Sequence, residues 1–231
     1  MQSAPLDGGL LYTETNLDHL FPEPFNFITS LFFLIPAIYW LLRLKGFNSR
    51  YSFLSVAAWL LLIGCIGGGI YHGFRRWSIF IFMDWLPIAL LCLMASVYLW
   101  IRVLGKWYYG VLTLFICVAI EAAMRTFITG SDTQLAISLN YVIMALMVIL
   151  PLILLIVKTK GFEWRLIGFA LAAFTVAIIF RTVDAHTSIA IGTHFLWHTF
   201  GMLATTAMFL YLFRLRSKEI MLEFKNQDLI A

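Results

Sequence analysis

The chain has 231 residues, of which 62% are hydrophobic and only 12% are charged. Soluble domains carry about 25% charged residues, so this composition excludes an ordinary soluble protein and favours a membrane protein. The formal charge is +4. This positive charge does not indicate a nucleic-acid partner, because the basic residues follow the pattern of a membrane topology.

Seven apolar segments approach the length of about 20 residues that spans a bilayer. In chain order they are residues 25–42, 53–71, 79–101, 108–128, 135–157, 166–180 and 195–213. The connections between them are short and leave no room for a second domain. We therefore expect an all-α integral membrane bundle of seven transmembrane helices over residues 25–216. An extramembrane arm (1–24) precedes the bundle and a cytoplasmic tail (217–231) follows it.

The basic residues are unequally divided between the two sides of the predicted membrane. Four of the 16 lie on one side, at Arg75, Arg76, Arg125 and Arg181. The other 12 lie on the opposite side and in the tail, at Arg43, Lys45, Arg50, Arg102, Lys106, Lys158, Lys160, Arg165, Arg214, Arg216, Lys218 and Lys225. Cytoplasmic loops are rich in Lys and Arg, which predicts a cytoplasmic C-terminus and an outside N-terminus. Small size and short loops favour a bacterial inner membrane.

Three histidines fall at the predicted outer end of the bundle. His72 ends the second apolar segment, and His194 and His198 begin the last one. Residues i and i+4 share a helical face, so the latter two can bind one metal ion together. Three imidazoles with an open fourth position are typical of catalytic zinc, and ionisable groups within membrane segments are usually functional. We therefore predict a zinc ion bound by these three histidines.

Four other charged residues are candidates for roles within the bundle. Asp84 lies at a similar depth and is a metal ligand, a partner of a ligand histidine, or a general base for the attacking water. Asp184 either orients a ligand histidine from the second shell or is a plain surface residue. Glu121 and Arg125 are spaced i, i+4 and are expected to neutralise each other.

Several motifs resemble those of the alkaline ceramidase family, part of a larger group of seven-span metal-dependent hydrolases that includes the adiponectin receptors. The run His194-Phe-Leu-Trp197-His198 is similar to the family's His-x-x-Trp-His signature. His72 followed by Asp84-Trp-Leu-Pro87 is similar to its His…Asp-x-Leu-Pro signature. Glu23-Pro-Phe-Asn26 resembles its entry into the first span, and the likeness extends over nearly the whole chain.

The resemblance implies zinc at His72, His194 and His198, with Asp84 acting on the attacking water. It also implies a calcium site outside the membrane, with oxygen ligands from Glu14, Asn16 and Glu23. In two respects the chain departs from the family. Leu11 and Tyr12 stand where the family's calcium motif begins with aspartate and tryptophan. Gly68 stands where the family has a serine, one turn before the first histidine, which leaves either another oxyanion donor, such as Tyr71 or Ser78, or a changed activity.

Together these observations predict a membrane-embedded, zinc-dependent amide hydrolase. Its expected substrate is a lipid, ceramide or a related N-acyl lipid, and its expected surroundings are membrane lipids. Two alternatives remain open at this stage. One is a seven-helix receptor or sensor with a structural zinc ion. The other is a haem-binding membrane protein with two of the histidines as axial ligands.

Overall fold

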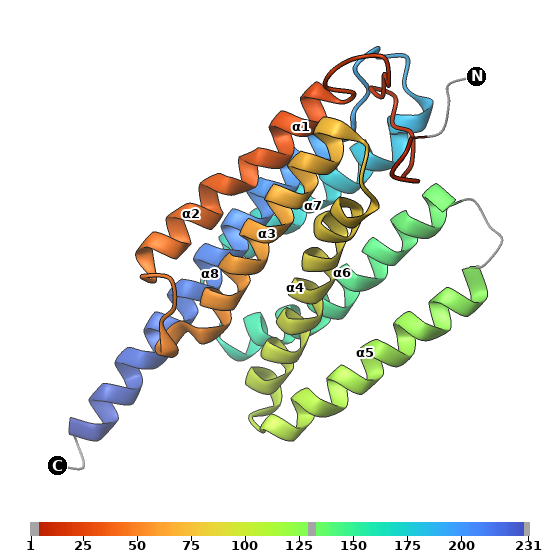
Figure 1. Ribbon diagram of the computed structural model, residues 1–231. Coiled ribbons are helices and arrows are strands. Elements are labelled where there is room, and N and C mark those ends of the chain that lie inside the picture. Colours follow the sequence, from red (N-terminus) through yellow and green to blue (C-terminus); the bar gives the residue numbers. More distant parts are fainter. Residues whose placement is uncertain (1–4, 129–132, 229–231) are drawn as a thin grey trace.

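The computed structural model describes residues 5–128 and 133–228, and its regular elements over these ranges are all helices. The side chains of Glu121 and Arg125 lie outside the described residues. The elements, labelled in Figure 1, are α1 (Pro24–Ser30), η1 (Leu31–Phe33), α2 (Leu34–Arg43), η2 (Ser49–Tyr51), α3 (Ser52–Phe74), α4 (Ser78–Leu104), α5 (Trp107–Ile128), α6 (Thr133–Lys158), α7 (Trp164–Val183), η3 (Asp184–His186) and α8 (His194–Asp228).

The regular structure of the described residues is all-helical and is consistent with an integral membrane protein. In the described part, six helical segments are long and apolar enough to cross a bilayer, with α1, η1 and α2 forming the first as one continuous segment. The other apolar helix is α5. The predicted segments match the helices to within three residues at each end, with one exception. That exception is α8, which continues to Asp228, so the predicted tail is helical up to that residue.

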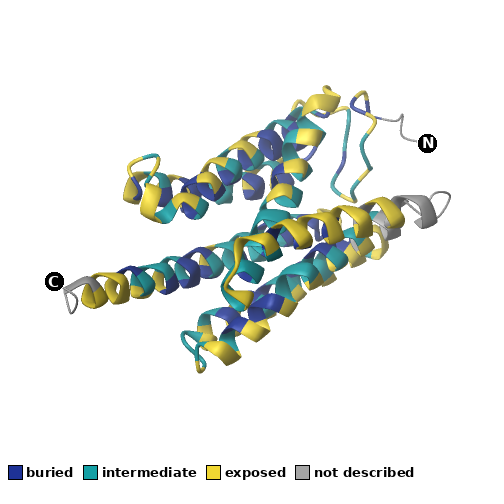
Figure 2. Cartoon of the chain, turned by 90° about the horizontal axis from the view of Figure 1, so that it is seen from below, coloured by how far each residue is buried: buried dark blue, intermediate teal, exposed yellow. Residues whose placement is uncertain are grey.

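Figure 2 shows buried residues where helices face one another and exposed residues on their outward faces. Many of the exposed residues are large and apolar. The main packed pairs are α3 with α4 and α7 with α8. A core of buried residues that includes Trp40, Leu54 and Tyr211 joins α2, α3 and α8. The α5 helix packs chiefly on α4 and leaves most of its surface exposed. An exposed apolar surface of this kind is suited to lipid.

The two ends of the bundle differ in chemistry. At one end the arm and the segment between α7 and α8 lie together, as Figure 1 shows in red and blue. Thr13 of the arm donates its backbone N–H to Asp184 Oδ2 at 3.0 Å. At the other end the loops predicted to be basic converge: Arg102 pairs with Glu219 at 3.0 Å and Arg214 with Glu163 at 2.7 Å.

Helices α3 and α4 approach closely where three glycines precede His72. A Cβ at Gly67 would overlap the Cβ of Met83 and lie 2.8 Å from its carbonyl oxygen. Pro87 lies inside α4, four residues after Met83. Because proline has no backbone N–H, the carbonyl of Met83 receives no helical hydrogen bond from position 87. The small residues of α3 thus let the backbones meet and bring Asp84 against the face of α3 that carries His72.

Candidate metal centre

His72, His194 and His198 come together at the end of the bundle beneath the N-terminal arm. One ligand atom from each lies within 4.8 Å of the others. Their ring centroids are 4.8–5.4 Å apart, and the three residues are 0–5% exposed. The predicted grouping is therefore present, with α3 supplying one histidine and α8 supplying two.

The donor atoms of this cluster fit a metal ion. Nδ1 of His72 lies 2.5 Å from Oε2 of Glu23, which leaves Nε2 for another partner. Among the residues that the structure describes, neither Nε2 of His72 nor Nδ1 of His194 has a hydrogen-bond partner. A buried polar atom without a partner is costly, and coordination satisfies an imidazole nitrogen. The three histidines can bind one metal ion, whose identity the cluster alone does not specify.

Helix α1 supports His198 from the other side. Nδ1 of His198 lies 3.1 Å from the Thr29 hydroxyl and 3.2 Å from the Ser30 hydroxyl. Thr29 donates its own hydrogen to the carbonyl of Phe25 at 2.7 Å, so it accepts from His198. Metal-bound histidines usually donate their second N–H in this way, which fixes the ring and its tautomer.

Asp184 positions His194 through the backbone. The side chain is buried, and its Oδ1 accepts the N–H groups of Thr193 at 2.6 Å and His194 at 2.9 Å. It therefore accepts N–H groups at the N-terminus of α8 from outside that helix, in the manner of a capping aspartate, although it lies in η3, ten residues before His194. The interpretation of Asp184 as a surface residue is therefore wrong. It does contact one of the three histidines, as the other interpretation expected, but through the backbone N–H of His194 rather than through the imidazole.

Asp84 belongs to α4 and faces Gly68 of α3, which lies one helical turn before His72. A Cβ at Gly68 would overlap Oδ1 of Asp84, and position 68 shares a helical face with position 72. The group of converging ligands in the described chain contains the three histidines and not Asp84. Its carboxyl group instead lines a cavity together with Ser30 and His198.

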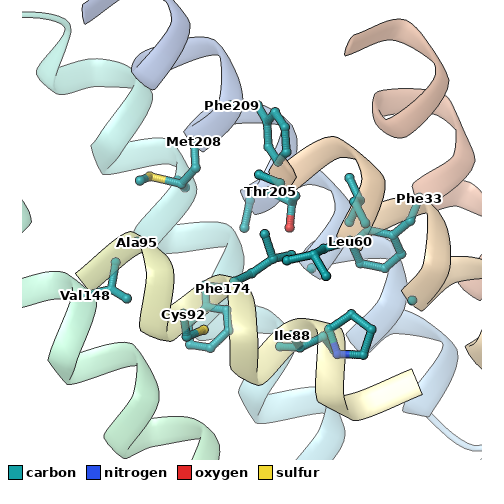
Figure 3. A pocket seen from close by; sticks show the side chains of 18 of the residues that line it. Phe33, Leu60, Ile88, Cys92, Ala95, Val148, Phe174, Thr205, Met208 and Phe209 are labelled. Atoms are coloured by element: carbon teal, nitrogen blue, oxygen red, sulfur yellow. The ribbon is translucent and has the colours of Figure 1, made fainter. Parts of the chain in front are cut away.

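That cavity has a volume of about 270 Å³ and runs into the core of the bundle. Figure 3 shows apolar side chains from several helices around it, among them Phe33, Leu60, Ile88 and Phe209. On α8 the lining extends from His198 to Leu212, a distance of about 21 Å at 1.5 Å per residue. The cavity is polar where it meets His198, Asp84 and Ser30, and its lining is mostly apolar elsewhere.

The three residues assigned to calcium each accept hydrogen bonds from different groups of the protein. Glu14 accepts the backbone N–H groups of Phe25 at 2.5 Å and Asn26 at 2.9 Å, at the start of α1. Asn16 accepts the N–H of Asp18 at 3.1 Å. Glu23 accepts hydrogen bonds from His72, from Thr15 at 2.6 Å and from Arg75. This corrects the expectation for Glu23, which faces a guanidinium and the histidine cluster.

The charge of Glu23 is stabilised by these partners. Burial alone would raise the pKa of its carboxyl group, but the hydrogen bond from His72 and the positive charge of Arg75 lower that pKa below the ordinary value. Glu23 is thus a buried carboxylate that can accept the Nδ1 hydrogen of His72 and increase the basicity of Nε2.

Sequence reasoning missed two residues beside the cluster. Tyr12 stacks on His194 with ring centroids 3.9 Å apart, and burial raises the pKa of its phenol. The guanidinium of Arg181 lies over the rings of Tyr141 at 5.0 Å and Trp197 at 5.4 Å. The predicted sixth span ended one residue before Arg181. The position of Arg181, a charged residue directly after an apolar segment and at the same end of the bundle as the histidines, was a signal that could have indicated its role.

Comparison of the chain with models of known protein families and with curated proteins finds no match. The chemical capacity of the site is therefore inferred from its geometry.

Proposed function

We propose that the protein is a membrane-embedded, zinc-dependent hydrolase of a lipid amide, with ceramide or a related N-acyl lipid as the substrate class. One observation carries this proposal. An apolar cavity inside the bundle ends at a polar cluster of His198, Asp84 and Ser30. Such a cavity suits a substrate with a long hydrocarbon chain and a hydrolysable group at its head.

The length of the cavity supports an acyl chain as its occupant. The hydrocarbon core of a bilayer is about 30 Å thick, so the acyl chains of one leaflet occupy about 15 Å. The lining of about 21 Å along α8 exceeds this length. A chain lying in the cavity with its head group at the polar end brings its carbonyl carbon to His198, Asp84 and Ser30.

Each residue at the polar end then has a role in hydrolysis. When bound by the three imidazoles, zinc supplies Lewis acidity that polarises the amide carbonyl and acidifies a water molecule. Asp84 accepts a proton from the attacking water and passes it to the leaving amine. The surrounding apolar wall excludes other water, which strengthens the electrostatic interactions within the site.

Ser30 is the proposed donor to the developing oxyanion. Its hydroxyl lies 3.5 Å from the point where a side chain at position 68 would begin, so it approaches the place of the serine that the resemblance implies. Because Thr29 accepts from His198, the Ser30 hydroxyl can donate into the cavity. The two donors suggested by sequence are less suitable: Ser78 is exposed, and Tyr71 lies against Arg75 with its guanidinium 4.7 Å from the ring.

Two alternatives fit the geometry less well. A structural zinc site is closed by a fourth protein ligand, whereas the converging group in the described chain has three ligands and adjoins a cavity. Axial haem ligation requires two imidazoles on opposite faces of a flat macrocycle. The ring centroids of the three histidines are only 4.8–5.4 Å apart, closer than two imidazoles on opposite faces of a macrocycle can lie.

The orientation of the protein is part of the proposal. The basic loops meet at the end of the bundle opposite the histidines. By the distribution of Lys and Arg that end is cytoplasmic, so the metal centre lies near the outer side of a bacterial inner membrane. Seven crossings place the N-terminus outside. When fused to the C-terminus, a reporter that functions only in the cytoplasm should be active, and a reporter that functions only outside should be inactive.

The deciding experiment compares wild type with Asp84→Asn on an apolar N-acyl amide in detergent or bilayer. Asn keeps the shape but cannot accept the proton, so hydrolysis should fall about 10²–10⁴-fold while elemental analysis still finds one zinc per chain. Asp18→Asn, in the exposed part of the arm, is the matched control. Loss of zinc together with activity would make Asp84 a ligand and favour the structural-zinc alternative. Full activity in Asp84→Asn would refute the proposed mechanism.

A further inference from the structure

Two carboxylates and a backbone carbonyl converge at the outer end of α3, and the group at their centre is a guanidinium. Arg75 donates from Nε to Asp7 Oδ2 at 2.8 Å and from one terminal nitrogen to Asp7 Oδ1 at 3.3 Å. The same nitrogen donates to the carbonyl of Leu10 at 2.8 Å. The other terminal nitrogen donates to Oε1 of Glu23. All three charged side chains are completely buried.

Oxygen donors of this kind are those that calcium prefers. The sequence resemblance assigned Glu23 to a calcium ion, but the structure surrounds Glu23 with donors that a cation would have to displace. A guanidinium also carries a positive charge that repels calcium. The residues present therefore do not fit the implied ion. They fit an arginine, whose planar fork binds carboxylates through two hydrogen bonds at once.

The backbone holds Arg75 in place for these contacts. Arg75 directly follows α3 and adopts φ 53°, a left-handed conformation that residues other than glycine rarely adopt. Its N–H donates to the carbonyl of Tyr71 at 3.0 Å, and its guanidinium lies 4.7 Å from the ring of Tyr71. This conformation turns the side chain back toward the arm and the start of α1.

The network links the arm to the metal centre. Asp7 and Leu10 belong to the arm, and Glu23 joins Arg75 on one oxygen to His72 on the other. Between these attachment points the arm places Tyr12 on His194. Without Arg75, two buried carboxylates would face each other with no cation between them, which is a costly arrangement.

We propose that Arg75 is a built-in counter-ion that takes the place of a bound divalent cation in fastening the arm over the metal centre. It acts as a positioning residue, because it reaches His72 only through Glu23. This last step rests on His72 being a metal ligand, whereas the fastening of the arm does not. The protein should therefore need no calcium either for stability or for retention of zinc.

The test uses the full-length, zinc-loaded protein in detergent, in calcium-depleted buffer with or without added calcium chloride. Two quantities are measured: the melting temperature and the rate of zinc loss to a competing chelator. Wild type should show the same values with and without calcium. Arg75→Ala should melt at a lower temperature and lose zinc about 10–100-fold faster, as expected when support of a ligand histidine is removed. Calcium should partly restore both values, because it can bind the vacated carboxylates.

Arg76→Ala is the matched control, because this neighbouring arginine is exposed. It should behave as wild type in both measurements. The double variant Asp7→Asn/Arg75→Ala should lose the response to calcium, since one of the two carboxylates has been neutralised. If Arg75→Ala does not fold, Arg75→Lys provides the same test. It should release zinc faster than wild type and remain insensitive to calcium, because the positive charge is kept.

Three results would overturn the inference: stabilisation of wild type by calcium, a calcium response in Arg75→Lys, or identical behaviour of the Ala variants at positions 75 and 76. None of these measurements depends on catalysis. If the protein hydrolyses no lipid amide, the proposed function fails while the role of Arg75 is still tested by zinc release and melting. If hydrolysis is found and Arg75 has no effect, the inference alone fails.

Discussion

Nδ1 of His72 lies 2.5 Å from Oε2 of Glu23, a residue 49 positions earlier in the chain. The contact joins the entry of the first membrane segment to the exit of the second. It assigns the Nδ1 hydrogen of His72 to a carboxylate, so that Nε2 keeps its lone pair for a metal ion. Glu23, which the sequence resemblance assigned to a calcium site outside the membrane, thus contacts His72 and can support it as a ligand of the proposed zinc ion.

Glu23→Gln should weaken zinc binding without abolishing it. The amide keeps the shape of the side chain but cannot compensate the charge of Arg75 or polarise His72 as a carboxylate does. Removal of such a supporting group typically costs 10–100-fold in metal affinity, which competition with a chelator would measure. Affinity equal to that of wild type would show that the contact with Glu23 does not support the metal centre.

Alanine at His72, His194 or His198 should each reduce zinc to well below one ion per chain. Each substitution removes one of three ligands, and two imidazoles do not complete a stable zinc site. His186→Ala provides the control, because His186 is exposed and lies outside the cluster. Metal analysis after dialysis distinguishes the variants. One retained zinc ion in any of the three would remove that histidine from the ligand set.

Gly68→Ala should reduce hydrolysis while zinc stays bound. The added Cβ would overlap Oδ1 of Asp84, so the carboxylate must move. A displacement of about 1 Å in a catalytic group can cost about 10²-fold in rate. Gly168→Ala is the matched control, since a Cβ at Gly168 in α7 meets no atom within 4 Å. Equal rates in the two variants would show that the position of Asp84 does not limit the reaction.

If the proposed hydrolysis takes place, Met208→Trp should shift the substrate preference toward shorter acyl chains. Met208 lines the cavity about 15 Å along α8 from His198, so an indole there shortens the space without reaching the histidines. Thr206→Trp adds the same side chain to the exposed face of that helix. The ratio of kcat/KM for short and long N-acyl substrates is the measurement. An unchanged ratio in Met208→Trp would argue against the cavity as the acyl site.

Asp184→Ala should lower the stability of the protein by about 2 kcal/mol, the upper part of the range for loss of a helix N-cap. Three backbone N–H groups, those of Thr13, Thr193 and His194, lose their acceptor. Because one of them belongs to a ligand histidine, zinc should also leave faster. Asp184→Asn keeps one acceptor oxygen and should fall between alanine and wild type in chemical unfolding followed by circular dichroism.

Much of the fold followed from local properties of the chain. Apolar length marks a membrane helix strongly, so the predicted segments matched the helices closely. The end of α8 could not be predicted from apolar length, because the helix continues beyond Phe213 with many polar residues. There it is stabilised by contacts between distant residues and neighbouring turns, such as Arg102 with Glu219 and Arg216 with Glu223 at 2.8 Å.

The grouping of the three histidines could be predicted, because residues at the same end of neighbouring membrane helices lie at the same depth and can meet. Their supporting groups could be predicted only in part. Asp184 was a candidate to orient one of the histidines, but its bond to the backbone of that residue was not expected. Glu23 and Thr29 contact His72 and His198 only because particular helices become neighbours. Arg75 was counted only as a loop charge, since nothing local to its sequence places Asp7 beside it.

The position of the histidines along the chain has a consequence for biogenesis. His72 emerges in the second membrane segment, whereas His194 and His198 emerge in the last, with about half of the chain synthesised between them. The complete site cannot exist until the final helix has entered the bilayer and packed against its partners. A chain that stops before α8 retains a single histidine ligand. Metal capture is thus available as a late checkpoint that separates finished bundles from truncated or misassembled ones.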